Sequence, residues 1–272
     1  MIVFPNCKIN LGLHILRKRE DGFHDLETVF YPIPLQDAVE VIQHPQPITD
    51  VEFSSSGLIV EGNLSDNICV KAYHLLKKDF SQLPPIKMHL HKTIPTGAGL
   101  GGGSADGSFT LMLLNKKFNL GLDEKALIHY ALQLGSDCPF FIRNMPCYAT
   151  GRGEKLEAIT VDLSAYKFVL VNPQIHVNTG WAFSQIKPSA DRRSLKELIS
   201  LPVEEWKTSL KNDFEEAVFA QHPQIKQCKE TLYNGGAVYA SMTGSGSTVF
   251  GIFLKDRALE LNFSKDYFVK IL

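Results

Sequence analysis

Residues 94–108, with the sequence IPTGAGLGGGSADGS, constrain the fold more than any other stretch, because five of the seven residues from 97 to 103 are glycine. Such a run exposes backbone N–H groups, and glycine lets an anion approach the backbone closely. It lies between a predicted strand, residues 86–94, and a predicted helix, residues 104–119. The first N–H groups of a helix lack internal partners, and the helix dipole favours negative charge there. We therefore predict a phosphate-binding loop in preference to a flexible loop or tight turn.

The loop differs from three common glycine motifs. A Walker A loop ends in Gly-Lys-Ser/Thr, whereas here Gly103 is followed by Ser-Ala, which excludes it. The spacing G-x-G-x-x-G begins at Gly97, but a dinucleotide fold also needs an acidic residue about 20 positions later, at the end of a second strand. The candidate, Asp123, instead caps a predicted helix. A protein-kinase glycine loop would be accompanied by His-Arg-Asp and Asp-Phe-Gly, which are absent.

Charge and composition narrow the range of partners. The 272 residues carry a formal net charge of −1, so no global field attracts nucleic acid or an anionic membrane. The five cysteines form no C-x-x-C pair, which disfavours a disulfide framework and a structural zinc site. The chain has no run of 18 apolar residues, and its first residues lack the pattern of a signal peptide. We therefore expect a cytoplasmic protein without a nucleic-acid or membrane partner; the sequence predicts no oligomeric state.

Hydrophobic periodicity predicts strands over most of the first sixty residues, including a hairpin at 51–62. Helices are expected at 65–80, capped by Ser65 or Asp66, at 104–119, and at 123–134, where Gly135 ends the helix. Short strands at 140–142 and 146–150 and a buried strand at 166–173 follow. The chain is then mostly helical to about residue 233, closes with two strands at 237–242 and 247–254, and ends with DYFVKIL, residues 266–272. Strands and helices are partly segregated, which indicates an α+β fold, and we expect two domains, 1–155 and 156–272.

Several polar residues have ordinary explanations when each is considered alone. Lys8 and Asn10 lie on the polar face of an alternating strand at 8–16, where a lysine is normally solvated. Asp137 follows Gly-Ser, a position typical of a turn or cap residue. His89 and His91 alternate on one strand face, but two ligands make a poor metal site, so we expect them to be exposed to solvent.

Two segments resemble the GHMP small-molecule kinases. PTGAGLGGGSAD, residues 95–106, resembles their phosphate loop P-x-x-x-G-L-G-S/G-S/G-S-A/S, and MTGSGSTVFGIF, residues 242–253, resembles their C-terminal glycine loop. The resemblance implies a two-domain α+β GHMP kinase fold, with an N-terminal ribosomal-protein-S5-like domain, a C-terminal α/β sandwich and the active site in the cleft between them. It implies ATP as co-substrate, with Mg²⁺ held mainly by the ATP phosphates; no metal ligand of the chain is identified. The implied ATP-binding residues are Pro95, Thr96, Gly97, Ala98, Gly99, Leu100, Gly101, Gly102, Gly103, Ser104 and Ala105, and those of the second glycine loop are Thr243, Gly244, Ser245 and Gly246.

The N-terminal segment indicates a particular branch of that superfamily. PNCKINLGLHILRKREDGFHDLETVF, residues 5–30, is similar to the signature P-A-K-I-N-L-x-L-x-I-x-x-K/R-R-x-D-G-Y-H-x-L-x-T of the kinases that act on 4-diphosphocytidyl-2-C-methyl-D-erythritol in the non-mevalonate isoprenoid pathway. LGSDCPFF, residues 134–141, resembles their L-G-x-D-V-P-F-F segment. The resemblance implies phosphorylation of the 2-hydroxyl of that substrate. Two alternatives stay open, namely a GHMP kinase for another small alcohol, such as mevalonate or homoserine, and a nucleotide-binding module without catalysis.

Three residues depart from the pattern of this branch. Cys7 stands where alanine is usual, and both are small. Phe23 replaces tyrosine, which keeps a stacking face but loses a hydroxyl. Gly107 stands where a helix-forming alanine is common. Of the three, only the change at Phe23 bears on ligand binding.

Phosphoryl transfer to a tertiary hydroxyl needs in-line positioning, charge neutralisation and a proton acceptor. The resemblance assigns Asp137 as the general base and Lys8 as its partner, which holds the aspartate ionised and stabilises charge on the transferring phosphate. It also makes Asn10 a hydrogen-bond partner of the reacting alcohol or a phosphate. Ser104 is predicted to cap the phosphate helix or to reach Mg²⁺ or a phosphate oxygen, and the two roles need different rotamers.

The cytidine end of such a substrate needs a flat aromatic slot and recognition of the base edge. By resemblance, His24 recognises the cytosine and Phe23 stacks nearby. Further substrate-binding candidates are Phe30, Tyr31 and Thr179.

Overall fold

The computed structural model describes residues 1–60 and 62–272 and divides into two compact units, each made of separate stretches of the chain. Unit 1 comprises Met1–Cys7, Pro32–Thr96 and Gly101–Met145, apart from residue 61. Unit 2 comprises Lys8–Tyr31, Gly97–Leu100 and Pro146–Leu272. The phosphate loop therefore contributes residues to both units. The sequence division at residue 155 stays a prediction.

Unit 1 contains a four-stranded sheet whose spatial order is β1-β4-β6-β5. Its strands are β1 (Ile2–Val3), β4 (Ala38–Gln43), β6 (Ile86–Lys92) and β5 (Val51–Gly57). The hairpin predicted at 51–62 is wrong, because residues 58–60 and 62 form no strand and β5 pairs instead with β6, to which it runs parallel. A parallel pair needs a crossover connection, and helix α1 (Ile68–Asp79) supplies it. Position 61 of the predicted hairpin lies outside the described residues.

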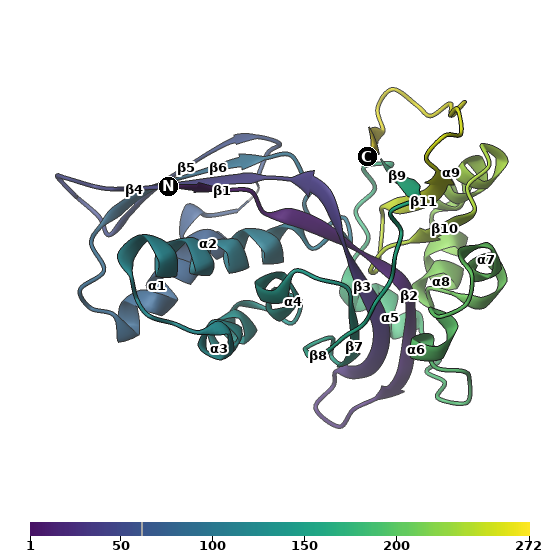
Figure 1. Ribbon diagram of the computed structural model, residues 1–272, viewed down its shortest axis with the longest axis horizontal. Helices are drawn as coiled ribbons and strands as arrows, with labels where there is room; N and C mark the ends of the chain where they lie inside the picture. Colours follow the sequence, from purple (N-terminus) through teal and green to yellow (C-terminus); the bar gives the residue numbers. More distant parts are fainter. Residues whose placement is uncertain (61) are drawn as a thin grey trace. The chain divides into compact units, whose positions relative to one another are not determined.

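Helices α1 and α2 (Gly102–Phe118) pack on one face of this sheet, as Figure 1 shows. Besides these two, the unit contains the 3₁₀ helix η1 (Leu64–Asp66), α3 (Glu124–Leu134), which contacts both of them, and α4 (Cys138–Arg143), which contacts α2. Their apolar side chains share one core with the strands, in which Leu90 of β6 and Leu111 of α2 are both buried. The caps predicted for α3 are confirmed, since Asp123 Oδ1 accepts the Ala126 N–H at 2.8 Å and the helix ends at Gly135.

Two helix starts differ from the prediction. The N-cap of α1 is Asn67, whose side chain accepts the Cys69 N–H at 2.9 Å, instead of Ser65 or Asp66. Helix α2 begins at Gly102, two residues before the predicted start at Ser104. Its N-cap is Gly101, which adopts the left-handed conformation with φ of 70°.

The strand predicted at 140–142 is also wrong, because this apolar stretch forms α4. Pro139 lies in the first turn of α4, where a proline is favoured because its missing N–H would have no helical partner. Asp137 occupies the N-cap position, but its side chain makes no capping hydrogen bond.

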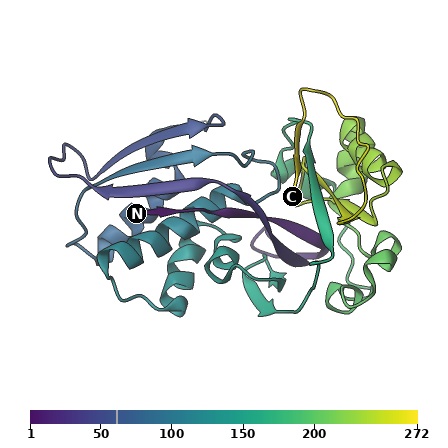
Figure 2. The ribbon, with the colours of Figure 1, turned by 45° about the horizontal axis from the view of Figure 1, so that its top comes forward.

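Unit 2 contains most of one sheet, of order β2-β3-β7-β8, and the whole of another, of order β10-β11-β9-β12. The strands are β2 (Asn6–Lys18), β3 (His24–Gln36), β7 (Cys147–Gly151), β8 (Lys155–Ala158), β9 (Tyr166–Asn172), β10 (Tyr239–Met242), β11 (Val249–Leu254) and β12 (Phe268–Ile271). The helices are α5 (Thr179–Gln185), α6 (Leu195–Leu198), η2 (Val203–Glu205), α7 (Trp206–Ser209), α8 (Phe214–Gln221) and α9 (Pro223–Asn234). Helix α9 packs on β10 and β11, at the right of Figure 2.

Both faces of β2 are buried along most of its length, so Lys8 is not solvated as a lone lysine on the polar face of a strand normally is. Lys8 is 3% exposed, Asn10 1% and His14 3%. His14 Nδ1 lies 2.8 Å from Oε1 of Glu27 on the neighbouring strand β3. A buried charge or amide requires hydrogen-bond partners, so this strand pair carries polar networks as well as core side chains.

Glu27 is the centre of one such network. Its carboxylate accepts hydrogen bonds from His14, from Tyr148 at 2.5 Å, from Ser194 at 2.9 Å and from the Leu195 N–H at 3.0 Å. Burial by itself would raise the pKa of Glu27, but these bonds outweigh it and lower the pKa to about 2. The network joins β2, β3, β7 and the start of α6.

Within the described residues, none of the helices has the length and hydropathy needed to span a bilayer.

Candidate active site

A buried lysine and amide in unit 2 lie directly beside the glycine loops. Lys8 Nζ donates to Asn10 Oδ1 at 2.8 Å and to the Gly99 carbonyl at 3.0 Å. The ammonium also lies 5.2 Å from the centre of the Phe30 ring, a cation–π distance. The backbone N–H of Gly244 donates to Asn10 Oδ1 at 2.9 Å. Five residues that the sequence assigned to the site are therefore in contact within one unit.

The two glycine loops pack backbone against backbone, which explains their composition. Gly99 has φ of +78°, and a Cβ atom there would lie 2.0 Å from the carbonyl oxygen of Thr243. Gly244 has φ of +57°, and its Cβ would lie 3.0 Å from the Cα of Gly99. The Thr248 N–H also donates to the Ala98 carbonyl at 3.2 Å. Only glycine permits this approach at 99 and 244.

Two buried asparagines that sequence reasoning missed hold the second glycine loop. Asn212 Nδ2 donates to the carbonyls of Met242 and Gly244, at 2.8 and 2.9 Å. Asn172 Nδ2 donates to the hydroxyls of Ser247 and Thr248, at 3.2 and 2.9 Å. The sequence around Asn212 carries only the signal of a helix start, a role it also fills through the Phe214 N–H.

In unit 1, the first turn of α2 lies next to the start of α4. Ser104 is in that turn, and the Ser108 hydroxyl, one turn later, donates to the Cys138 carbonyl at 2.8 Å. Burial raises the pKa of Cys138 to about 11, and the hydroxyls of Ser104 and Ser108 oppose the rise. Asp137, the residue before Cys138, is half-buried. The structure thus brings the segments of Ser104 and Asp137 together beside the helix N-terminus.

A buried cluster of three charged side chains lies next to the phosphate loop. Lys92 Nζ lies 2.5 Å from Asp37 Oδ2 and 2.7 Å from Asp106 Oδ2, and all three side chains are buried. The other oxygen of Asp37 accepts the N–H groups of Thr93 and Ile94. Burial, together with the Asp37 carboxylate, raises the pKa of Asp106 although Lys92 opposes the rise. Oδ1 of Asp106 has no hydrogen-bond partner among the described residues.

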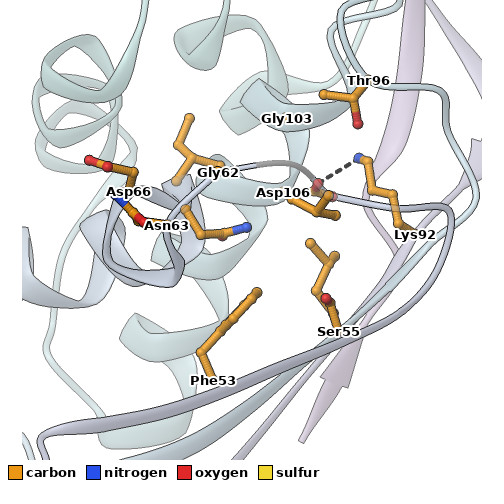
Figure 3. Close-up of a pocket in the computed structure, with 13 residues that line it drawn as sticks. Phe53, Ser55, Gly62, Asn63, Asp66, Lys92, Thr96, Gly103 and Asp106 are labelled. Atoms are coloured by element: carbon orange, nitrogen blue, oxygen red, sulfur yellow. Dashed lines mark hydrogen bonds and ion pairs between the residues drawn. The ribbon is translucent and has the colours of Figure 1, made fainter.

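Lys92 and Asp106 line a cavity of about 200 Å³ in unit 1. Figure 3 shows the pair joined at one side of this cavity, near Thr96, with Asn63 and Asp66 on the other side. Gly103 of the phosphate loop also lines it, as do the apolar side chains of Phe53, Val60, Ile68 and Leu90. The cavity therefore combines apolar walls with a few polar groups directly beside the phosphate loop, as ligand sites generally do.

The aromatic residues predicted for the cytidine end have different surroundings. His24 stacks on Phe183, with ring centres 4.9 Å apart and planes 22° apart. Burial, with a smaller effect from the charge of Lys18, lowers the pKa of His24, which favours the neutral imidazole. Phe23 is 50% exposed, and the guanidinium of Arg152 lies 4.0 Å from its ring centre. Phe183 was missed because an aromatic residue in a short helix carries no distinctive signal.

The three remaining residues predicted to bind the substrate lie in different surroundings. Phe30 is buried beneath Lys8, so its ring is a wall of the lysine site. Thr179 Oγ1 lies 3.0 Å from Ser245 Oγ of the second glycine loop. Tyr31 packs against Phe168 of β9.

The two histidines of β6 belong to a surface network. His89 hydrogen-bonds to Ser54 and Ser56 of β5, and Ser56 also bonds His91. His91 is exposed, as predicted, whereas His89 is only partly exposed. In the part of the chain that the structure describes, no group of three or more His, Cys, Asp or Glu residues could hold a metal ion.

Family models match the chain in two places. The N-terminal domain of GHMP kinases matches residues 67–144, and the C-terminal domain matches residues 188–262. These matches and the contact between the two glycine loops define the class as a GHMP kinase, an ATP-dependent phosphotransferase acting on an alcohol.

Relatives of known name identify the branch. The 4-diphosphocytidyl-2-C-methyl-D-erythritol kinase of Bacteroides fragilis is 53% identical over 253 residues, which cover 93% of this chain and 92% of that protein. The kinase of the same name from Cytophaga hutchinsonii is 47% identical over 254 residues, covering 93% and 92%. The chain belongs to this kinase family.

Solved structures agree at the level of the fold. A crystal structure of 4-(cytidine 5'-diphospho)-2C-methyl-D-erythritol kinase matches with a TM-score of 0.80 and 28% identity, covering 93% of this chain and 90% of that one. Mevalonate kinase of Methanococcus jannaschii matches with a TM-score of 0.67 at 14% identity, over 93% and 90% of the two chains. The second likeness indicates a shared GHMP kinase fold and nothing about the substrate.

Proposed function

We propose that this protein transfers the γ-phosphate of ATP to the 2-hydroxyl of 4-diphosphocytidyl-2-C-methyl-D-erythritol, a step of the non-mevalonate route to isoprenoid precursors. The observation that carries this proposal is the set of relatives with that activity in their name, which match the chain over more than nine-tenths of its length. The D-G-F-H segment of the β2–β3 turn supports the same substrate, because kinases for smaller alcohols have no cytidine to bind.

The phosphates of ATP bind at residues 95–105 and beside the second glycine loop. This assignment is supported by the start of α2, which has no side-chain cap for its first N–H groups, and by the glycine contacts described above. The nucleoside occupies the cavity of unit 1, because that cavity reaches the phosphate loop at Thr96 and Gly103.

Asp137 and Lys8 each have a role in the transfer. Asp137 accepts the proton of the substrate hydroxyl, and the Lys8 ammonium stabilises negative charge on the phosphoryl group. The burial of Lys8 supports its role, since a desolvated charge acts strongly on nearby groups. The Asn10 amide is already bonded to Lys8, Thr28 and the second glycine loop. These bonds favour a role for Asn10 in holding Lys8 over one in binding the alcohol.

Mg²⁺ fits the oxygen groups near the phosphate helix. It prefers oxygen ligands and usually combines one or two protein groups with phosphates and water. Because Ser104 does not cap α2, its hydroxyl is a suitable protein ligand for an ion held mainly by the ATP phosphates. When bound, the ion neutralises charge on the phosphates.

The cytidine ring stacks at His24 and Phe183. Because these two rings already stack face to face, the base would add a third ring to the stack, which supports this assignment. We also propose that the protein acts in the cytoplasm on this small-molecule substrate, where its five buried thiols would stay reduced.

Release of ADP with three acceptor alcohols tests the proposal. We expect release with 4-diphosphocytidyl-2-C-methyl-D-erythritol and only background release with mevalonate or homoserine. Because only an enzyme with a cytidine site should bind CDP, binding of CDP alone provides an independent reading. Turnover of mevalonate or homoserine, without turnover of the cytidyl substrate, would show that the chain is a different GHMP kinase. ATP binding without release from any alcohol would favour a nucleotide-binding module.

A further inference from the structure

The orientation of the Asn10 side-chain amide follows from its neighbours alone. Lys8 Nζ lies 2.8 Å from Oδ1, and the backbone nitrogen of Gly244 lies 2.9 Å from the same atom. An ammonium and a backbone N–H can only donate, so the amide atom between them must be the oxygen. The NH₂ group therefore points the other way, toward Thr28, with 2.9 Å between Nδ2 and Oγ1.

Thr28 completes this sequence of donors and acceptors. Because the amide donates, the Thr28 oxygen accepts, and its own proton is directed to the Gly12 carbonyl at 2.6 Å. Thr28 is 0% exposed and Asn10 is 1% exposed, so water is not at hand to replace either partner. Thr28 is also β-branched, which restricts its rotamer. Only one assignment of the protons satisfies every atom from the Gly12 carbonyl to the Lys8 ammonium.

We propose that Thr28 is a positioning residue for phosphoryl transfer, which acts by holding the Asn10 amide with its oxygen toward Lys8 and Gly244. The kinetic part of this inference rests on the proposed function, because it takes Lys8 as the group that stabilises the transferring phosphate. Without the Thr28 oxygen, the buried NH₂ group has lost its acceptor. If the amide then flipped, its NH₂ group would face the Lys8 ammonium and the Gly244 N–H, which are both donors. Lys8 and the second glycine loop would therefore have to move.

The expected effect is on turnover more than on nucleotide affinity. Lys8 keeps its second bond, to the Gly99 carbonyl, in the absence of Thr28. The nucleoside cavity of unit 1 contains no residue of this network. A displacement of about 1 Å in a catalytic group costs on the order of 100-fold in rate. A residue that merely stabilised the fold would instead lower the amount of active enzyme and leave kcat per folded molecule unchanged.

Three variants and two measurements test the inference. Thr28→Val removes the hydroxyl and keeps the shape, Thr28→Ser keeps the hydroxyl, and Thr110→Val makes the same change at another fully buried threonine, whose hydroxyl bonds its own helix. The measurements are kcat and KM for ATP, and hydrogen exchange of the Asn10 side-chain amide followed by NMR. The second does not depend on any substrate.

For Thr28→Val we expect kcat to fall roughly 10- to 100-fold, KM for ATP to stay within about twofold of wild type, and the Asn10 amide protons to exchange faster. Thr28→Ser should restore both readings, and Thr110→Val should change neither. The inference is overturned if Thr28→Val keeps wild-type kcat, if its amide exchange is unchanged, or if Thr28→Ser behaves like Thr28→Val. A wild type that phosphorylates a different alcohol would refute the proposed substrate alone, and kcat would then be measured with that alcohol.

Discussion

At the residue scale, the polar side chains between β2 and β3 determine both stability and chemistry. Lys8 and Asn10 belong to the candidate site, whereas His14 and Glu27 lie further along the same strands and have no ligand assigned to them. The sequence alternation identified which residues share a face. It could not reveal that this face is buried, because Glu27 finds its partners Tyr148 and Ser194 more than a hundred residues later.

Replacement of Glu27 by glutamine should make the free energy of unfolding less dependent on pH in the acidic range. The pKa of Glu27 is lowered from an ordinary value near 4.5 to about 2, so its ionised form stabilises the fold above about pH 4.5 and this contribution is lost as the pH falls toward 2. The shift corresponds to roughly 3 kcal/mol. We expect urea unfolding to show wild type more stable than Glu27→Gln at pH 6, with the difference shrinking toward pH 3. A difference that stays constant with pH would contradict the role of Glu27.

At the scale of elements, the two glycine loops act as a pair. The resemblance placed them in one nucleotide site, and the structure adds the reason for their glycines, namely the close approach of Gly99 to Thr243 and Gly244. Local signals such as the caps of α3 were predictable because the partners are neighbours in sequence. Helix α4 was not, because the short apolar stretch at 140–142 fits a strand as well as a buried helix. The parallel pairing of β5 with β6 was not predictable either, since it depends on how α1 packs between the two strands in the chain.

Gly99→Ala should therefore weaken ATP binding by more than backbone strain alone explains. Gly121 provides the matched control, because its φ of +73° is close to that of Gly99 but a Cβ there would meet nothing within 4 Å. We expect Gly121→Ala to cost about 1–2 kcal/mol of stability with ATP affinity unchanged. Gly99→Ala should destabilise more and raise the Kd for ATP at least about tenfold, as measured by calorimetry. If Gly99→Ala and Gly121→Ala lost the same stability and had the same Kd for ATP, close contact between the two glycine loops would not be required.

At the scale of the whole molecule, the fold and the substrate are established by different observations. Mevalonate kinase shares the fold at 14% identity, so the arrangement of helices and sheets identifies a GHMP kinase and cannot choose its alcohol. The choice rests on the N-terminal segment around Phe23 and His24 and on relatives that cover nearly the whole chain. Sequence patterns predicted the α+β class and both glycine loops. They could not locate Phe183, Asn172 or Asn212, whose roles depend on contacts made only in the folded chain.

The central claim, that this chain is a kinase with Asp137 as its general base, is tested most directly by one experiment. Transfer of labelled γ-phosphate from ATP to 4-diphosphocytidyl-2-C-methyl-D-erythritol is measured for wild type and for Asp137→Asn, with the Kd for ATP determined on the same samples. We predict transfer by wild type and a rate roughly 10²- to 10⁴-fold lower for the variant, with ATP affinity nearly unchanged. No transfer by wild type, or transfer by Asp137→Asn at close to the wild-type rate, would contradict it.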